Sequence, residues 1–264
     1  MDLCTIASAQ FFPQAANLIQ SYRHHSYNKN IYLYYFNTPP AALKPLKGLF
    51  GDQLTTIEVE EVCPHALSPR VFFYKVYALH DCINNHSSQF IYSDSANCFI
   101  RDATRIHEDL IDDSLFLPYD LEKLKNKYWT TKKCFKAIEC ESAKDEMQYW
   151  AGFQVYKRTQ KNLTLVGEML EFMKDPLIAK PETTVQYPDG EHSPCIEHRC
   201  DQSVLSLLIH KHGRHHKFDY LKNLKYGDWQ TIAALDKSFK PDTTKTILSV
   251  RESKFGGFRF LEKK

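Results

Sequence analysis

The chain has 264 residues, which is enough for one large domain with a substantial core or for two small domains. Its 34 basic and 32 acidic residues leave a formal net charge of +2. This balance gives no field of the strength that nucleic-acid or membrane-surface binding uses, so nucleic acid is not expected as a partner.

The cysteines and the N-terminus predict a cytoplasmic protein. The eight cysteines are scattered and form no CxxC pair, which favours buried, reduced thiols over a disulfide framework or a zinc site. Residues 1–5 enter an apolar run at once, without the basic region and long apolar core of a signal peptide. No stretch of the sequence approaches the length of a transmembrane segment.

Strand and helix patterns alternate in the first part of the chain. Strands are predicted at residues 3–7, 31–36, 54–59 and 90–92, and helices at residues 13–27 and 71–83. Pro13 suits the first turn of the earlier helix. This β-α-β-β-α-β order predicts an α/β fold with a mostly parallel central sheet flanked by helices.

Beyond residue 102 the periodicity weakens. Helices are predicted at residues 103–111 and 163–173, a strand at 150–156 and an exposed connection at 181–194. Residues 121–138 carry six lysines among three aromatic residues. A solvated face is the favoured interpretation of this stretch, and a mobile loop that shapes an acceptor site is the alternative. The chain shows no internal repeat and no interdomain linker.

Two polar segments stand out because each adjoins an apolar run. Asp94 follows the strand at residues 90–92, and a carboxylate at the C-terminal tip of a strand in an open α/β sheet lies where ligands usually bind. An ordinary turn is the alternative. Residues 198–203 read His-Arg-Cys-Asp-Gln-Ser and lead into the apolar helix predicted at 204–209.

From residue 3 to about residue 213 the chain resembles the GT-A class of nucleotide-sugar-dependent glycosyltransferases. It is most similar to a group of GT-A-like proteins with an HRxDQS-type motif, and less similar to the family of glycogenin and the lipopolysaccharide galactosyltransferases. The matched features are Ala7-Ser8, Tyr74-Lys75, residues 92–96, Ala151-Gly152-Phe153 and Asp201-Gln202-Ser203. Each feature is short, and their order and separation carry the resemblance.

The resemblance implies a single GT-A-like (Rossmann-like) domain over residues 1–264, with a donor-binding half at about 1–102 and an acceptor-binding half at about 103–264. It implies a transferase that moves a hexose or pentose from a nucleotide-diphosphate donor, with UDP expected, to a saccharide or glycoconjugate hydroxyl, as in polysaccharide biosynthesis. Asp201 and Gln202 would be catalytic, beside the reacting sugar carbon. Donor-binding residues would be Ala7, Ser8, Lys75, Asp94, Ser95, Ala96, Trp150, Ala151, Gly152, Arg251 and Lys254.

In the GT-A class the Asp94 region would be the DxD motif, whose two carboxylates hold Mn²⁺ or Mg²⁺ against the donor diphosphate. This chain departs from the motif, because its second acidic position is Ala96. A divalent cation at Asp94 therefore needs other ligands, with Asn97 or Asp102 as possible substitutes. A second candidate set is His210, His212, His215 and His216. For these histidines a structural role at a helix end is favoured, because the helix dipole attracts cations there.

Several candidate residues have plain structural alternatives. Lys75 is either a donor-binding cation or a surface lysine. Asp201 is a sugar-site carboxylate, the N-cap of a helix, or both. Arg251 and Lys254 either close over the diphosphate or belong to a basic tail.

Three functions follow from these patterns. The leading one is a glycosyltransferase, with retention slightly favoured because Asp201-Gln202 resembles the retaining glycogenin-type pair; an inverting enzyme needs a base, and Asp201 is a candidate for that role too. The second is a catalytically inactive nucleotide-sugar binding module, which Ala96 motivates. The third is a nucleotidyltransferase, but residues 8–12 lack the glycine-rich, basic loop expected after its first strand. The oligomeric state is not indicated.

Overall fold

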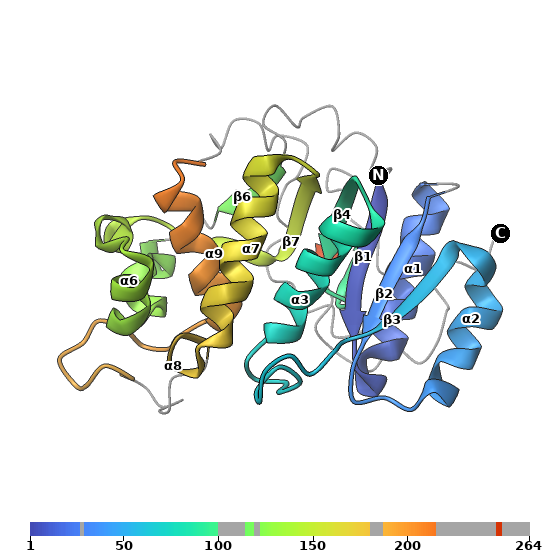
Figure 1. Cartoon of the computed structure of the whole chain (residues 1–264), viewed down its shortest axis with the longest axis horizontal. Coiled ribbons are helices and arrows are strands. Elements are labelled where there is room, and N and C mark those ends of the chain that lie inside the picture. The colour runs from blue at the N-terminus through green and yellow to red at the C-terminus, as the bar shows by residue number, and fades with distance from the viewer. Residues whose placement is uncertain (27–28, 100–113, 119–121, 180–186, 215–246, 250–264) are drawn as a thin grey trace, which may run out of the picture. The chain divides into compact units, whose positions relative to one another are not determined.

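The computed structural model describes residues 1–26, 29–99, 114–118, 122–179, 187–214 and 247–249 (Figure 1). The chain divides into two compact units. Unit 1 comprises residues 1–58, 89–112 and 218–264, and unit 2 comprises residues 59–88 and 113–217. Both units draw on separate stretches of sequence, whereas the two expected halves meet near residue 102. The single domain over residues 1–264 stays a prediction.

Unit 1 is built on four parallel strands. They are β1 (Asp2–Ala7), β2 (Ile31–Tyr35), β3 (Leu54–Glu58) and β4 (Gln89–Ser93). In the register, Leu3 of β1 lies between Ile31 of β2 and Ile91 of β4. All three of these side chains are buried, as expected for parallel strands that are covered on both faces. The four predicted strands are therefore confirmed, each to within about two residues.

Helices connect and cover these strands. Helix α1 (Phe12–His25) joins β1 to β2, and α2 (Lys44–Phe50) precedes β3 (Figure 1). Pro13 lies in the first turn of α1, where its missing N–H is not needed. Tyr22 of α1 packs its ring edge-on against Phe99 at a centroid distance of 5.1 Å. Phe99 belongs to β5 (Asn97–Phe99), which pairs antiparallel with β8 (Ile247–Ser249).

Unit 2 combines an antiparallel strand pair with a group of helices. Strand β6 (Ser114–Pro118) pairs with β7 (Tyr149–Lys157). The longer helices are α3 (Phe73–Asp81), α7 (Gln160–Lys174) and α9 (Cys200–Lys211), and α7 packs against both others (Figure 1). The shorter ones are α5 (Asn126–Trp129), α6 (Lys132–Ile138) and α8 (Pro176–Ala179). Every residue of α9 from Cys200 to Ile209 is buried, so this helix forms the centre of the unit.

Short helical turns complete the backbone. Turns of 3₁₀ type lie at Ala9–Phe11, Pro40–Leu43, Gly51–Gln53, Glu122–Leu124 and Glu141–Asp145, and a π-type turn at Cys82–His86 extends α3. The lysine-rich stretch at residues 121–138 thus contains short helices, and its lysines 123, 132, 133 and 136 are exposed. The predicted helix at 103–111 lies outside the described residues.

Within unit 1 the strands have the order β3-β2-β1-β4, all parallel, and within unit 2 β7 pairs with β6. The predicted α/β architecture, a mostly parallel sheet flanked by helices, is confirmed. Strand β6 is an addition that the sequence patterns did not reveal, and it introduces the antiparallel pairing. All eight cysteines are free thiols, as predicted. Among the described residues, no helix combines the length and apolar character needed to cross a bilayer.

Candidate functional site

The strand order of unit 1 contains a topological switch point. The chain runs from β1 to β2 and β3 on one side, and then returns to place β4 on the other side of β1. In open α/β sheets, ligands bind beyond the carboxyl ends of the strands at such a reversal. Strand β1 ends at Ala7 and β4 at Ser93, so Ala7, Ser8 and Asp94 lie at this edge of the sheet. The position expected for Asp94 at a strand tip is therefore confirmed.

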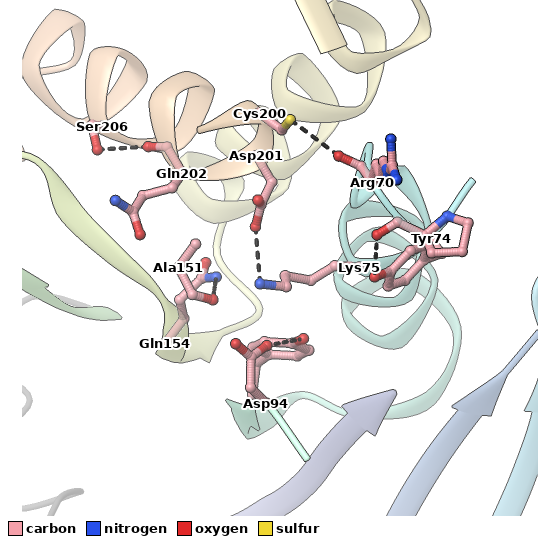
Figure 2. Close-up of polar contacts among 12 residues, drawn as sticks. Arg70, Tyr74, Lys75, Asp94, Ala151, Gln154, Cys200, Asp201, Gln202 and Ser206 are labelled. Carbon is pink, nitrogen blue, oxygen red and sulfur yellow. Dashed lines mark hydrogen bonds and ion pairs between the residues drawn. The ribbon is translucent and has the colours of Figure 1, made fainter. Parts of the chain in front are cut away.

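Asp94 is held in place by its own strand and the turn that follows. The Tyr92 hydroxyl donates a hydrogen bond to Asp94 Oδ1 at 2.8 Å (Figure 2). The backbone N–H of Asn97 donates to the Asp94 carbonyl at 3.0 Å, which closes the turn. Buried Thr5 donates from Oγ1 to the Ser93 carbonyl at 2.8 Å and ties the end of β4 to β1. Asp94, Ser95 and Ala96 are all partly exposed, so the carboxylate is positioned and yet accessible.

The surroundings of Asp94 provide few further metal ligands. Asn97 is buried and donates from Nδ2 to Ser93 Oγ at 3.0 Å, so its amide serves the turn. Asp102 lies outside the described residues. Within the described ranges, no group of three or more His, Cys, Asp or Glu side chains has the arrangement of a metal site. Asp94 fits a divalent cation as a single hard oxygen ligand, and the remaining ligands would come from a diphosphate and water.

Unit 2 contains a buried ion pair between α3 and α9. Lys75 Nζ lies 3.0 Å from Asp201 Oδ2, and the two side chains are only 7% and 5% exposed (Figure 2). Asp201 occupies the first turn of α9, where the helix dipole stabilises a negative charge. Removing two charges from water is costly, so each one depends on the other. Lys75 is therefore not the surface lysine that one alternative expected.

The N-cap alternative for Asp201 is wrong. The N-cap residue of α9 is Arg199, and no side chain caps the helix there. A capping carboxylate must turn back toward the N–H groups of the first turn, whereas Asp201 lies within that turn and extends its carboxylate to Lys75.

Backbone strain flanks the ion pair on both elements. Cys200, immediately before Asp201, has φ 43°, and Phe72, three residues before Lys75, has φ 60°. Left-handed backbone in non-glycine residues costs of order 1–3 kcal/mol and tends to cluster at functional sites. The Cys200 thiol donates to the Arg70 carbonyl at 3.5 Å, which links the two strained segments (Figure 2).

The remaining residues of the motif at 198–203 each have a defined contact. The guanidinium carbon of Arg199 lies 3.9 Å from the centre of the Trp129 ring, a cation–π contact. Gln202 donates from Nε2 to Gln148 Oε1 at 2.6 Å. Ser203 donates from Oγ to the Trp129 carbonyl at 2.6 Å. The motif therefore fixes the start of α9 against the residues around Trp129 and Gln148.

His198 is the buried titratable group of this motif. The Thr131 N–H donates to its Nδ1 at 3.3 Å. Burial lowers the pKa of His198 from 6.5 to about 4, and a backbone contact with Ile178 opposes this shift. Burial also raises the pKa of the Cys200 thiol to about 12, with the Asp201 charge as the next contribution. His198 is therefore a neutral hydrogen-bond acceptor, and Cys200 stays protonated.

Three of the predicted site residues, Trp150, Ala151 and Gly152, lie in the buried strand β7. Trp150 and Phe153 are buried with stacked rings at 6.3 Å between centroids. Gln154 donates from Nε2 to the Ala151 carbonyl at 2.8 Å. Gly152 is buried in the same strand. The donor-binding role proposed for Trp150, Ala151 and Gly152 stays a prediction.

Other sequence candidates do not join a metal site within the described residues. His210 contacts the Met147 carbonyl at 3.0 Å, and His212 contacts Glu168 at 2.5 Å. His215, His216, Arg251 and Lys254 lie outside the described residues. Conversely, Tyr92, Gln148 and Trp129 were not predicted as partners of Asp94, Gln202 and Arg199. No local pattern marks Gln148 or Trp129, because the partner of each is distant along the chain.

Comparison with known proteins supports the fold. No protein-family profile matches the sequence, and a comparison with curated protein sequences finds no match. Galactosyltransferase LgtC, solved with donor and acceptor sugar analogues, shares 13% identity at a TM-score of 0.50, over 79% of this chain and 70% of that one. The chain therefore has a GT-A-like fold.

Two further solved structures are similar at lower scores. The bifunctional glycosyltransferase WbbM shares 12% identity at a TM-score of 0.48, over 66% of this chain. Mouse xyloside xylosyltransferase 1 shares 12% identity at a TM-score of 0.47, over 80% of this chain and 82% of that one. The chain spans about a third, 34%, of the length of WbbM.

A double-mutant cycle tests the buried ion pair. Lys75→Met leaves the Asp201 carboxylate buried without its ammonium partner, and we expect it to lower the free energy of unfolding by about 3–5 kcal/mol. The double variant Lys75→Met/Asp201→Val removes both charges and should lose less than Lys75→Met alone. Urea unfolding followed by circular dichroism provides the measurement.

The exposed pair Lys127–Asp145, with Nζ 2.6 Å from Oδ1, is the matched control. Its single and double variants should show little coupling, because solvent screens an exposed pair. A Lys75→Met/Asp201→Val variant that loses the sum of the two single effects would show that the buried pair is not coupled.

The stability of the protein should also depend on His198 and pH. Because the folded-state pKa of about 4 lies below the unfolded value of 6.5, the unfolded state binds more protons between these values. The contribution of His198 is fully present above pH 6.5 and is lost as pH falls toward 4. Between pH 7 and pH 4.5 this loss amounts to about 2–3 kcal/mol.

His198→Asn keeps a hydrogen-bond acceptor for Thr131 but does not titrate. Denaturant unfolding at a series of pH values should therefore show a shallower loss of stability for this variant than for the wild-type protein. His192→Asn, at an exposed histidine of the same unit, should keep the wild-type pH dependence. Equal slopes in all three proteins would rule out the contribution of His198.

Proposed function

We propose that the protein is a nucleotide-sugar-dependent glycosyltransferase that moves a hexose or pentose to a saccharide or glycoconjugate hydroxyl, with UDP as the donor nucleotide. The observation that carries the proposal is the accessible Asp94 carboxylate at the switch point of unit 1. The GT-A-like fold and the sequence resemblance to the HRxDQS-motif group support it.

In the proposed donor site, Ala7 and Ser8 lie at the carboxyl end of β1, where the nucleoside of the donor would bind. Asp94 would face the diphosphate through a divalent cation, Mn²⁺ or Mg²⁺. Such a cation supplies charge stabilisation for the leaving nucleotide. The Tyr92 hydroxyl orients the carboxylate by its hydrogen bond to Oδ1.

In the proposed sugar site, Asp201 and Gln202 would bind the transferred sugar beside its anomeric carbon. Lys75 keeps the Asp201 carboxylate ionised and oriented, since an adjacent ammonium favours the charged form. Gln148 orients the Gln202 amide through the 2.6 Å hydrogen bond. Both first-turn residues of α9 are thus fixed before a substrate arrives, which lowers the entropy cost of positioning it.

The alternative function is a nucleotide-sugar binding module without catalysis. The observation that favours it is the single carboxylate at the strand tip, because Ala96 replaces the second acid of the DxD motif. The two functions differ in turnover and not in binding. A thermal-shift screen with UDP-glucose, UDP-galactose and UDP-xylose, with and without Mn²⁺, detects binding in either case. Release of UDP from the stabilising donor then separates the enzyme from the binding module.

The Asp94→Asn substitution should lower the rate of UDP release at least about tenfold, since one charge-assisted interaction in a developing-charge site contributes 1.4 kcal/mol or more. Unfolding stability should change little, because the side chain is partly exposed.

Glu58→Gln is a matched control for this variant. Glu58 ends β3 at the same edge of the sheet and, like Asp94, faces a tyrosine hydroxyl, with Tyr35 Oη 3.4 Å from Oε2. It lies away from the switch point, so its variant should keep the wild-type rate. An Asp94→Asn enzyme with unchanged turnover would show that Asp94 is a turn residue only.

Retention of anomeric configuration is the expected stereochemical outcome. Asp201 is engaged by Lys75 Nζ, which suits a sugar-binding carboxylate better than a general base, because an adjacent ammonium reduces basicity. Proton NMR of the freshly formed product gives the anomeric coupling constant and therefore the configuration. A product of configuration opposite to the donor would make the enzyme inverting and Asp201 the candidate base.

A further inference from the structure

Phe72 is an aromatic residue at the surface of unit 2, directly beside the buried ion pair. It precedes α3 with φ 60° and ψ 16°, and 38% of its surface is exposed. Lys75 Nζ lies 5.3 Å from the centre of its ring, and the Tyr74 ring lies 6.0 Å away. The aromatic ring is thus in contact with the same ammonium that pairs with Asp201.

The fold alone does not account for phenylalanine at this position. Left-handed backbone favours glycine or asparagine, and a bulky side chain there is strained. An exposed aromatic ring also gives up part of the stabilisation that burial would provide. A single exposed apolar residue is ordinary, but one that is also strained and adjacent to a buried charge pair is not.

The contact with Lys75 determines which part of the Phe72 ring faces the interior of the protein. Lys75 is only 7% exposed, so the part of the ring that faces its ammonium points into the protein. The exposed surface of Phe72 is therefore on the part of the ring that points away from Lys75. The face of an aromatic ring carries negative potential, which attracts C–H groups polarised by neighbouring oxygens. The rigid α3 helix begins at the next residue and holds the ring in place.

We propose that Phe72 is a stacking subsite for a pyranose ring of the acceptor saccharide. A pyranose has an apolar C–H face that packs on an aromatic ring and a rim of hydroxyls that needs hydrogen-bond partners. Phe72 offers the first surface, beside the buried Lys75–Asp201 pair that fixes the start of α3. This inference rests on the proposed function, and it identifies Phe72 as a specificity-determining residue for the acceptor.

The test measures saccharide binding directly, without relying on turnover. Methyl β-galactopyranoside, methyl α-glucopyranoside and methyl β-xylopyranoside are titrated into the full-length protein, with and without millimolar UDP and Mn²⁺, and followed by saturation-transfer NMR. Uridine is a fourth probe, because a flat nucleobase also stacks on aromatic rings. The variants are Phe72→Leu, which removes the aromatic face, and Phe72→Tyr, which keeps it.

Tyr187→Leu is the matched control. Tyr187 is also aromatic, left-handed at φ 64° and 41% exposed, and it lies in unit 2 as well, where its N–H donates to the Ile196 carbonyl. Circular dichroism verifies that all variants are folded.

The expected result is that at least one pyranoside binds the wild-type protein and that Phe72→Leu weakens it about three- to tenfold. Phe72→Tyr and Tyr187→Leu should bind as the wild-type protein does. The proposal is overturned if no pyranoside binds, if Phe72→Leu binds normally, if Tyr187→Leu loses as much, or if uridine alone depends on Phe72. Failure of the proposed function would be detected in a different assay, in which the wild-type protein would release no UDP from any donor. Pyranoside binding that depends on Phe72 would in that case still establish the subsite.

Discussion

The buried ion pair between Lys75 and Asp201 is the interaction on which the organisation of unit 2 depends. Two charges enclosed at 7% and 5% exposure are tolerated only as a pair, so the first turns of α3 and α9 must keep a fixed separation. The contacts around the pair meet this requirement. Cys200 bonds to the Arg70 carbonyl, and Gln202 and Ser203 bond to Gln148 and Trp129 on the other side of the helix start. A polar network of this kind specifies one arrangement when its members are satisfied.

Unit 1 depends on a different constraint, which is topological. The chain passes from β1 through β2 and β3 and then returns to place β4 on the other side of β1. This reversal is the topological switch point of the sheet, where the connections of two neighbouring strands lead in opposite directions. Ala7, Ser8 and Asp94 at this edge are small or polar, while the strands behind them are mostly apolar. Under the proposed function, the residues that hold the fold would therefore be separate from those that bind the donor.

The sequence predicted the parallel strands well, because strands covered on both faces read as apolar runs, as residues 31–36 and 90–92 do. It also placed Asp94 at the tip of a strand, whereas the site roles of Asp94 and of the motif at 198–203 stay predictions. It did not reveal β6, and it misjudged Asp201 as a possible N-cap. Capping rules consider neighbours along the chain, whereas the carboxylate of Asp201 is directed by a lysine on another helix. Gln148 and Trp129 were missed for the same reason, because their partners Gln202 and Arg199 are distant along the chain.

Strain and buried charge coincide in unit 2, and this coincidence has a physical meaning. The left-handed residue Phe72 immediately precedes α3, and the left-handed residue Cys200 is the first residue of α9, so both adjoin the ion pair. Glycine at either position would relieve the backbone, and well-packed apolar side chains in place of the pair would often be equally stable or more so. A sequence selected for stability alone would therefore be expected to lose these features. Strained backbone and buried charge of this kind tend to cluster at functional sites, and this tendency supports the sugar-binding role proposed for Asp201 and Gln202.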